Sequence, residues 1–158
     1  APAQSVTPMN DHAAKFLADW QTYRGPTESF IEEVFLLKPL GTENAEALAL
    51  LTNKAKDLAT SVRWNLNQLP YLTVWKNTAS REDGYVTGIE PATGYPFNRL
   101  VERKYNRVPK LAPGETRNFT LDFGIHVGKE EVDPLIAEAT DLQTQAILEL
   151  IPTPPKTE

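Results

Sequence analysis

A glutamate directly before a proline is the feature of this sequence with the clearest potential for chemistry. Glu90 and Pro91 lie in the run GYVTGIEPATGYP. Because proline has no amide hydrogen for a sheet ladder, we expect a strand to end at Glu90 and the chain to turn outward. Alternation along the strand places Val86 and Gly88 on the same face as Glu90, with open space over the glycine. A ligand could fill that space; alternatively, Glu90 caps a turn and Gly88 marks a β-bulge.

Other residues that could do chemistry are few. The sequence has no cysteine, which excludes disulfides and thiolate catalysis, and it has only two histidines. His12 falls in the first turn of an expected helix, where it is most simply solvated. His126 falls on the polar face of an expected strand, where it could act as an acid or base or only form hydrogen bonds. No Gly-rich phosphate loop, nucleophile elbow or His-Glu-x-x-His motif occurs, so we expect no metal and no cofactor.

Aromatic residues gather around the two strands that lead to Glu90. Trp75, Tyr71, Tyr85 and Tyr95 lie on or next to these strands. Sugars lay their C–H faces on aromatic rings while carboxylates and amides bind their hydroxyl groups, so the combination favours a carbohydrate ligand. The alternative is that Trp75 belongs to the hydrophobic core and the lysine after it to a strand end.

The spacing of apolar residues predicts a β-rich region between two helices. After a loop-like opening, Asn10 or Asp11 can cap a short helix, and Asp133 with Pro134 can begin a second helix that ends at about residue 149. Short β-prone runs separated by turn signals lie between these helices and suggest an antiparallel meander. The runs are 30–37, 45–52, 58–66, 71–77, 84–90 and 116–127.

The last of these runs alternates most clearly between apolar and polar residues. Its apolar row consists of Phe119, Leu121, Phe123, Ile125 and Val127. Since an antiparallel sheet buries one face, we expect this row to be covered.

Length and composition predict a globular protein. With 158 residues, of which 41% are hydrophobic and 23% charged, we expect one domain over residues 1–151 and a disordered, proline-rich tail over 152–158. No apolar run is long enough to cross a bilayer and no secretory pattern opens the chain, so we expect no membrane partner and a cytoplasmic location. The chain begins with Ala1, which indicates processing or truncation.

The charge balance argues against a nucleic-acid partner. The formal net charge is -5, whereas binding to phosphate backbones needs clustered basic residues. The densest basic stretch, residues 99–110, contains Arg99 and Arg103 but is interrupted by Glu102. We interpret it as a solvated hairpin.

Three segments, in their order along the chain, resemble a known family. They are LPYLTVWKN at residues 69–77, GYVTGIEPATGYP at 84–96 and LAPGETRNF at 111–119. Together they resemble the C-terminal half of an aldose 1-epimerase-like protein, from a poorly characterised branch of the galactose mutarotase superfamily. The Glu-Pro-Ala-Thr run and the Leu-Ala-Pro-Gly-Glu-Thr turn are the most specific parts of the resemblance.

The resemblance implies a mainly β, antiparallel β-sandwich that forms part of a supersandwich. The short N-terminal helix and the C-terminal helix come from the capping and spacing signals above, and the C-terminal helix is an addition to the fold that the resemblance implies. It implies interconversion of the α and β anomers of an aldose, with Glu90 as the general base. Weaker candidates for contacts with the sugar are Trp75, Lys76, Thr93, Arg99 and Arg103, although both arginines could be plain surface charges. The alternatives are a non-catalytic carbohydrate-binding module and a structural sandwich domain of a larger protein.

The sequence also departs from the family. Complete members are much longer, and their general-acid histidine and substrate-binding arginine come from a half that has no counterpart here. His12 and His126 do not occupy the motif position of that acid. We therefore expect a partner, either the missing N-terminal half or a second copy, to cover exposed strand edges.

Overall fold

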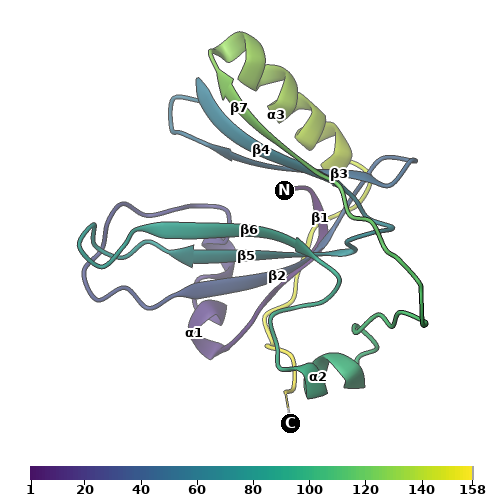
Figure 1. Ribbon diagram of the computed structural model, residues 1–158. Coiled ribbons are helices and arrows are strands. Elements are labelled where there is room, and N and C mark those ends of the chain that lie inside the picture. Colours follow the sequence, from purple (N-terminus) through teal and green to yellow (C-terminus); the bar gives the residue numbers. More distant parts are fainter. Residues whose placement is uncertain (158) are drawn as a thin grey trace.

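Two β-sheets face one another across the core of the computed structural model, which describes residues 1–157 (Figure 1). The larger sheet has five strands in the order β6-β5-β2-β1-β8, and the smaller has three in the order β3-β4-β7. All neighbouring strands are antiparallel except β1 and β8. The strands are β1 Ala3–Pro8, β2 Glu33–Pro39, β3 Glu46–Thr52, β4 Leu58–Asn65, β5 Tyr71–Asn77, β6 Val86–Ala92, β7 Leu121–Val127 and β8 Glu149–Leu150.

The helices are short except for the last. They are α1 Asp11–Ala14, a 3₁₀ turn at Leu17–Asp19, α2 Arg99–Lys104 and α3 Lys129–Gln143. Helix α3 packs on the smaller sheet, whereas α2 follows the end of β6 (Figure 1). In the part of the chain that the structure describes, no helix is long and apolar enough to cross a bilayer. The cytoplasmic location stays a prediction.

The core lies between the inner faces of the two sheets. Alternate residues of β2 and β5, such as Phe35 and Leu72, meet alternate residues of β3 and β4, such as Ala49 and Trp64. The mainly β, antiparallel sandwich is thereby confirmed, but a simple meander is wrong, because the chain leaves the larger sheet after β2 and returns to it at β5. In hairpins such as β3-β4 and β5-β6 the paired strands are neighbours in the sequence. The residues that meet between the two sheets are far apart in the sequence, so a local pattern does not predict their contact.

The opening segment was expected to be a loop but forms strand β1. It lies between β2 and β8, and its residues Ala3 and Val6 are fully buried. The register with β2 shifts between Ala3 and Ser5, which is the signature of a bulge. A bulge breaks the period-two pattern, which explains why alternation did not predict this strand.

The short opening helix is confirmed, and its cap is Asn10. The side-chain oxygen of Asn10 accepts a hydrogen bond of 2.9 Å from the Ala13 amide, which satisfies one of the free donors of the first turn. The helix ends at Ala14 and continues as the 3₁₀ turn. Leu17 and Trp20 enter the core, as their spacing predicted.

The last helix begins and ends earlier than the expected range of about 133–149. It begins at Lys129 after Gly128, whose φ of 95° favours glycine, so Pro134 lies inside the helix rather than at its first position. It ends at Gln143, whose amide nitrogen donates to the carbonyls of Ala3 and Ala146. Residues Glu149–Leu150 instead form β8 beside β1.

Residues 152–157 form no helix or strand. The carbonyl of Lys156 accepts a hydrogen bond from the Tyr105 hydroxyl. The domain limits at 1–151 and the disorder of the tail stay predictions, and residue 158 lies outside the described residues.

The apolar row of the last strand is mostly uncovered. Leu121 packs against the core, but Phe123, Ile125 and Val127 are 78%, 76% and 63% exposed. Strand β7 is the outermost strand of the smaller sheet, so its outer backbone edge has no neighbour among residues 1–157. The expectation that this whole row is covered is wrong for the described chain.

Candidate functional site

Strand β6 does not end at Glu90. Its pairing with β5 continues through Pro91, opposite Leu72, to Ala92, opposite Tyr71. Strand β6 is the outermost strand of its sheet, so one side of its backbone has no partner strand among residues 1–157. A proline there can lack an amide hydrogen without removing a ladder bond. The expected stop at Glu90 is therefore wrong, and the carboxylate projects from within the strand.

The register of β5 and β6 places Glu90, Gly88 and Trp75 on one face of the sheet. Glu90 lies opposite Thr73, and Gly88 lies opposite Trp75. The intervening residue Ile89 points to the other face, where it packs against the core. The pairing runs without a shift along the whole of β6, so the bulge and turn-cap alternatives for Gly88 and Glu90 are not supported.

The space over Gly88 exists, but the carboxylate of Glu90 occupies it. A Cβ added to Gly88 would lie 3.0 Å from Cδ and 3.2 Å from Cγ of Glu90, with Oε1 closer still. The glycine thus allows Glu90 to fold back along the strand. Glu90 is exposed, and within residues 1–157 it has no hydrogen-bond or ion-pair partner. Its carboxylate is free to accept a hydrogen bond from a ligand.

Trp75 is fixed beside this carboxylate. Its indole nitrogen donates a hydrogen bond of 2.8 Å to Oε2 of Glu32, which holds the ring orientation. Trp75 is half-buried and is not part of the core cluster between the sheets. A ring on the Glu90 face, directly opposite a glycine, is a physically reasonable platform for a sugar.

Lys76 lies on the opposite face and does not join the site. Its side chain is 2% exposed, and Nζ donates to the carbonyls of Asp19 and Thr22, both at 3.0 Å. Nζ is also 3.6 Å from Oε2 of Glu33. Burial lowers the pKa of Lys76, and the charge of Glu33 opposes that shift. Alternation predicts this outcome, because neighbours such as Trp75 and Lys76 cannot share a face of one strand.

A hollow of about 410 Å³ lies just beyond the end of β6. Ala92, which shares the Glu90 face, forms part of its wall, and Thr93 and Arg99 line it. Glu90 itself does not line this hollow, and neither does the exposed Arg103. Of the predicted sugar contacts, the structure thus places Trp75 beside Glu90 and Thr93 and Arg99 at the adjoining hollow.

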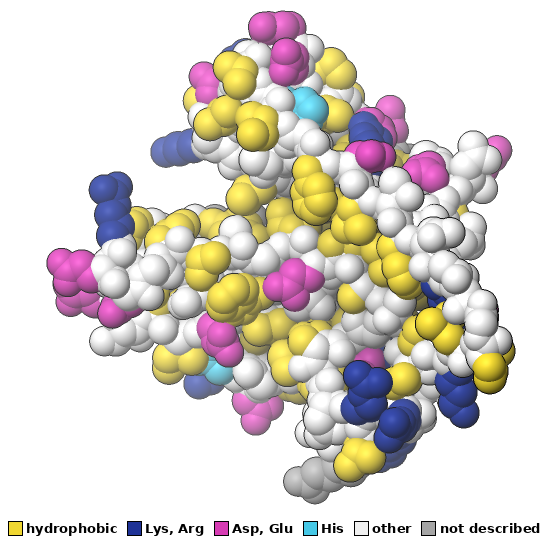
Figure 2. Space-filling view, in the orientation of Figure 1, with side chains coloured by type: hydrophobic (Ala, Val, Ile, Leu, Met, Phe, Trp, Pro, Cys, Tyr) yellow, Lys and Arg dark blue, Asp and Glu magenta, His cyan; other side chains and the backbone are white. Residues whose placement is uncertain are grey.

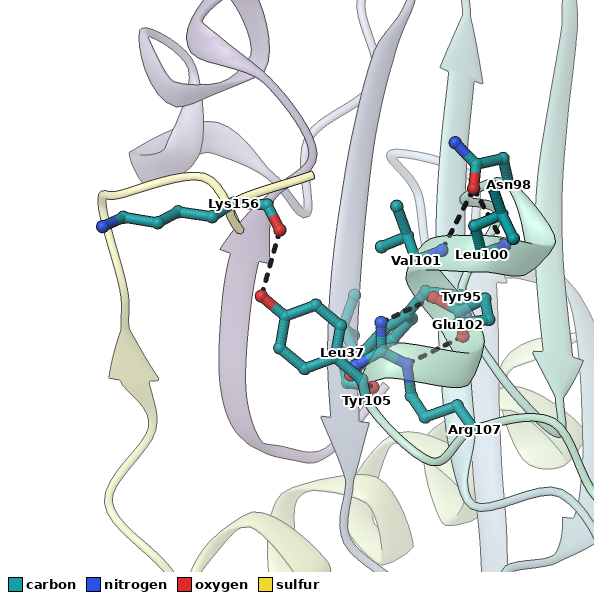
Figure 3. A network of polar contacts seen from close by, with 9 residues as sticks. All are labelled: Leu37, Tyr95, Asn98, Leu100, Val101, Glu102, Tyr105, Arg107 and Lys156. Atoms are coloured by element: carbon teal, nitrogen blue, oxygen red, sulfur yellow. Dashed lines mark hydrogen bonds and ion pairs between the residues drawn. The ribbon is translucent and has the colours of Figure 1, made fainter. Parts of the chain in front are cut away.

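The base of the hollow is a buried ion pair that sequence reasoning missed (Figure 3). Arg107 donates from Nε and Nη2 to the two carboxylate oxygens of Glu102, at 2.7 and 2.5 Å. The Tyr95 amide donates to the same carboxylate at 3.0 Å. The hydrogen bond with Glu102 raises the pKa of Arg107, and burial raises the pKa of Tyr95.

Three tyrosine rings surround the Arg107 guanidinium. The rings of Tyr71, Tyr95 and Tyr105 have their centres 4.5 to 5.9 Å from it, a geometry that favours the cation. The solvated hairpin expected over residues 99–110 is therefore wrong in its first part: Glu102 is 6% exposed, and Arg99–Lys104 form α2. The helix had one detectable signal, the capping residue Asn98, which accepts from the first-turn amides.

The two histidines lie elsewhere. His126 is on the smaller sheet, where Nε2 lies 2.9 Å from the Ser61 hydroxyl, and His12 packs against the Phe16 ring. Among the described residues, no group of three histidine, aspartate or glutamate side chains could hold a metal ion.

The chain shares its fold with a solved structure and belongs to a described family. The whole chain superimposes on a crystal structure described as a putative aldose 1-epimerase from Klebsiella pneumoniae subsp. pneumoniae MGH 78578, with a TM-score of 0.97 and 40% sequence identity. Residues 1–125 match the family described as "Domain of unknown function (DUF4432)", and the chain belongs to this family.

The structural match covers all of this chain but less than half of the Klebsiella protein. The chain spans only 41% of the Klebsiella protein's length. The expected resemblance to aldose 1-epimerase-like proteins is confirmed. A comparison with curated proteins gives no match.

Proposed function

We propose that this chain carries the general base of an aldose 1-epimerase-like enzyme that interconverts sugar anomers. The observation that supports this most is the position of Glu90: an unpaired carboxylate that shares a sheet face with Trp75, in a chain that superimposes on a putative aldose 1-epimerase. The proposed ligand is a small aldose, whose ring would lie against Trp75.

The chemistry needs two groups. Glu90 takes the proton from the C1 hydroxyl, and the C1–O5 bond breaks with its electron pair moving to the ring oxygen. An acid gives that oxygen a proton, C1 rotates in the open-chain aldehyde, and the same steps in reverse close the ring as the other anomer. Glu90 returns to its carboxylate form after each turnover. The sugar is neither oxidised nor reduced, so the reaction needs no redox partner.

The acid is proposed to come from a further stretch of polypeptide. Neither histidine lies on the Glu90 face, and the chain spans only 41% of the Klebsiella protein. The exposed row Phe123, Ile125 and Val127, on an unpaired strand edge, is the surface on which such polypeptide would pack. We propose that its occupant corresponds to the remainder of the longer relative rather than to a second copy.

Polarimetry tests the enzyme proposal. The rate at which freshly dissolved α-glucose or α-galactose reaches its anomeric equilibrium is measured with the chain assembled with the part of the Klebsiella protein that it does not match. The same assembly is measured with Glu90→Gln and with the control Glu82→Gln, which removes a carboxylate from an exposed turn. We expect acceleration by the assembly and a loss of about 10² to 10⁴-fold in Glu90→Gln. Equal acceleration by Glu90→Gln and the control would rule out Glu90 as the base.

A non-catalytic carbohydrate-binding or structural role is the second candidate. The observation that favours it is the exposure of Glu90 without an acid nearby among residues 1–157. Tryptophan fluorescence separates the two: Trp20 and Trp64 are buried, so a sugar-dependent change that disappears in Trp75→Phe reports binding at the Glu90 face. When the polypeptide proposed to supply the acid is present, binding without acceleration indicates a binding module, and the absence of both binding and acceleration indicates a structural domain.

A further inference from the structure

The hollow at the end of β6 is a preorganised structure rather than a gap between loops. Its backbone at Gly94 packs directly against the buried ion pair: a Cβ there would lie 2.5 Å from Oε2 of Glu102 and 2.9 Å from the Arg107 carbonyl. The Tyr95 hydroxyl is fixed by a hydrogen bond of 3.0 Å to the carbonyl of Leu37 on strand β2. Helix, turn and sheet are therefore held together around the hollow (Figure 3).

The lining of the hollow has more positive than negative charge. Glu102 is its one carboxylate and is occupied by Arg107 and the Tyr95 amide. The remaining nitrogen of Arg107, Nη1, has no hydrogen-bond acceptor in residues 1–157, and the Arg99 guanidinium has none at all there. Two arginines and one glutamate leave one positive charge, although the whole chain has a net charge of -5.

Basic side chains also gather near the hollow. Figure 2 shows lysine and arginine side chains gathered at the lower right of the molecule, over α2 and the segment near it. A concentration of one sign of charge beside a hollow attracts ligands of the opposite sign.

The hollow is within reach of a ligand bound at Glu90. Ala92 lines the hollow and is the next residue after Glu90 on the same face of β6. Side chains two residues apart on a strand are separated by about 7 Å. A single sugar ring could therefore place its anomeric hydroxyl at Glu90 and a substituent from its far side in the hollow.

We infer that the hollow binds an oxyanion group attached to the sugar, with Arg99 as its main contact. The inference rests on the proposed function and names its substrate class: an aldose that carries a phosphate or a carboxylate. A guanidinium presents parallel N–H donors that match the oxygens of either group, and such charge-assisted bonds are stronger than neutral ones. Arg107 also lines the hollow, and its bonds to Glu102 use Nε and Nη2 but not Nη1, so it is proposed as a second donor.

Isothermal titration calorimetry of the chain tests this inference. The ligands are glucose 6-phosphate, glucuronate, glucose and inorganic phosphate, titrated at one ionic strength. We expect one of the two charged sugars to bind at least about tenfold more tightly than glucose, and Arg99→Gln to remove most of that difference. The stronger charged ligand identifies the group as phosphate or carboxylate. Lys110→Gln, next to the lining residue Pro109, removes an equal charge outside the hollow and should change affinity little.

Three results would overturn the inference: equal affinity for charged and neutral sugars, equal losses in Arg99→Gln and Lys110→Gln, or no binding of either charged sugar. If neither charged sugar binds, the chain has no site for an anion. Polarimetry separates this failure from failure of the proposed function. If Glu90→Gln leaves anomerisation unchanged while Arg99-dependent binding persists, only the enzyme proposal fails. If the charged sugars bind no better than glucose while turnover depends on Glu90, only the anion site fails.

Discussion

Strands β6 and β7 are both edge strands, yet they present opposite surfaces. Strand β6 presents Gly88 and the charged Glu90 on the face away from the core, and Pro91 in its backbone. Strand β7 presents the exposed apolar side chains of Phe123 and Ile125 beside an unprotected backbone edge. Proline and charge prevent further strand pairing, whereas a bare apolar edge promotes it. The difference agrees with the two proposals above, a small-molecule surface at β6 and a protein-binding surface at β7.

The two edges also differ in how they are supported. The end of β6 leads into the ion pair of Glu102 and Arg107, which is enclosed by tyrosine rings. Beside β7, the outer face of the sheet is held to α3 by an ion pair between Arg63 and Glu138, with both side chains about one-third exposed. Buried pairs are sensitive to the loss of one partner, and exposed pairs much less so. Substitutions should reveal this contrast.

The largest effect is expected at the buried pair behind β6. Glu102→Ala leaves the Arg107 guanidinium and the Tyr95 amide without their shared acceptor, and should lower the free energy of unfolding by about 3 to 5 kcal/mol. Urea denaturation measures this change. Glu115→Ala is the control, because its pair with Arg117 is exposed and 3.7 Å long, and it should cost less than about 1 kcal/mol. Similar costs in both variants would contradict a structural role for the buried pair.

A smaller effect, confined to function, is expected at Gly88. In Gly88→Ala the new methyl group takes the space in which the Glu90 carboxylate lies, so that carboxylate must move. Since a flexible side chain can move without disturbing the sheet, the melting temperature should change little. A displacement of about 1 Å at a catalytic group can cost about 10²-fold in rate, which polarimetry would detect. An unchanged rate would show that the folded-back position of Glu90 is not the working one.

The sequence predicted the fold where local patterns decide it. The turn signals on either side defined β5 as Tyr71–Asn77, and Asn10 marked the first helix. The missed elements depend on distant partners: β1 contains a bulge, and β8 has only two residues, which pair with β1. Glu102 and Arg107 are five residues apart, which is not the three- or four-residue spacing of side chains that meet on a helix. The sequence therefore did not predict that they form a buried ion pair.

Only part of the candidate site was predicted, because local alternation reveals some of its residues and the three-dimensional arrangement determines the others. Alternation correctly placed Gly88 on the Glu90 face, and alternation applied to β5 would have removed Lys76. The stop at Pro91 was wrong because the effect of a proline depends on whether its strand is central or at an edge, which a sequence does not reveal. The hollow required the three-dimensional position of α2 beside the end of β6.

A more modest effect is expected at the protein-binding edge. Phe123→Lys places a charge in the apolar row of β7 and should weaken, by about tenfold or more, binding to the part of the Klebsiella protein that this chain does not match. Co-expression followed by quantitative affinity capture measures it. Leu100→Lys is the matched control, because Leu100 is 74% exposed on α2. Loss of a dimer in Phe123→Lys, measured by sedimentation, would instead assign the surface to a second copy.

The smallest effect is expected at the pair that holds α3. The hydrogen bonds from Arg63 lower the pKa of Glu138 below its ordinary value of 4.5. A carboxylate whose pKa is lower in the folded state stabilises the protein fully above pH 4.5, and this contribution disappears as the pH falls through the lowered value. Because the pair is partly exposed, Glu138→Gln should cost less than about 1 kcal/mol at neutral pH and nothing in strong acid. Thermal unfolding at both pH values checks this, and a cost that persists in acid would show that α3 is held by the packing of residue 138 rather than by its charge.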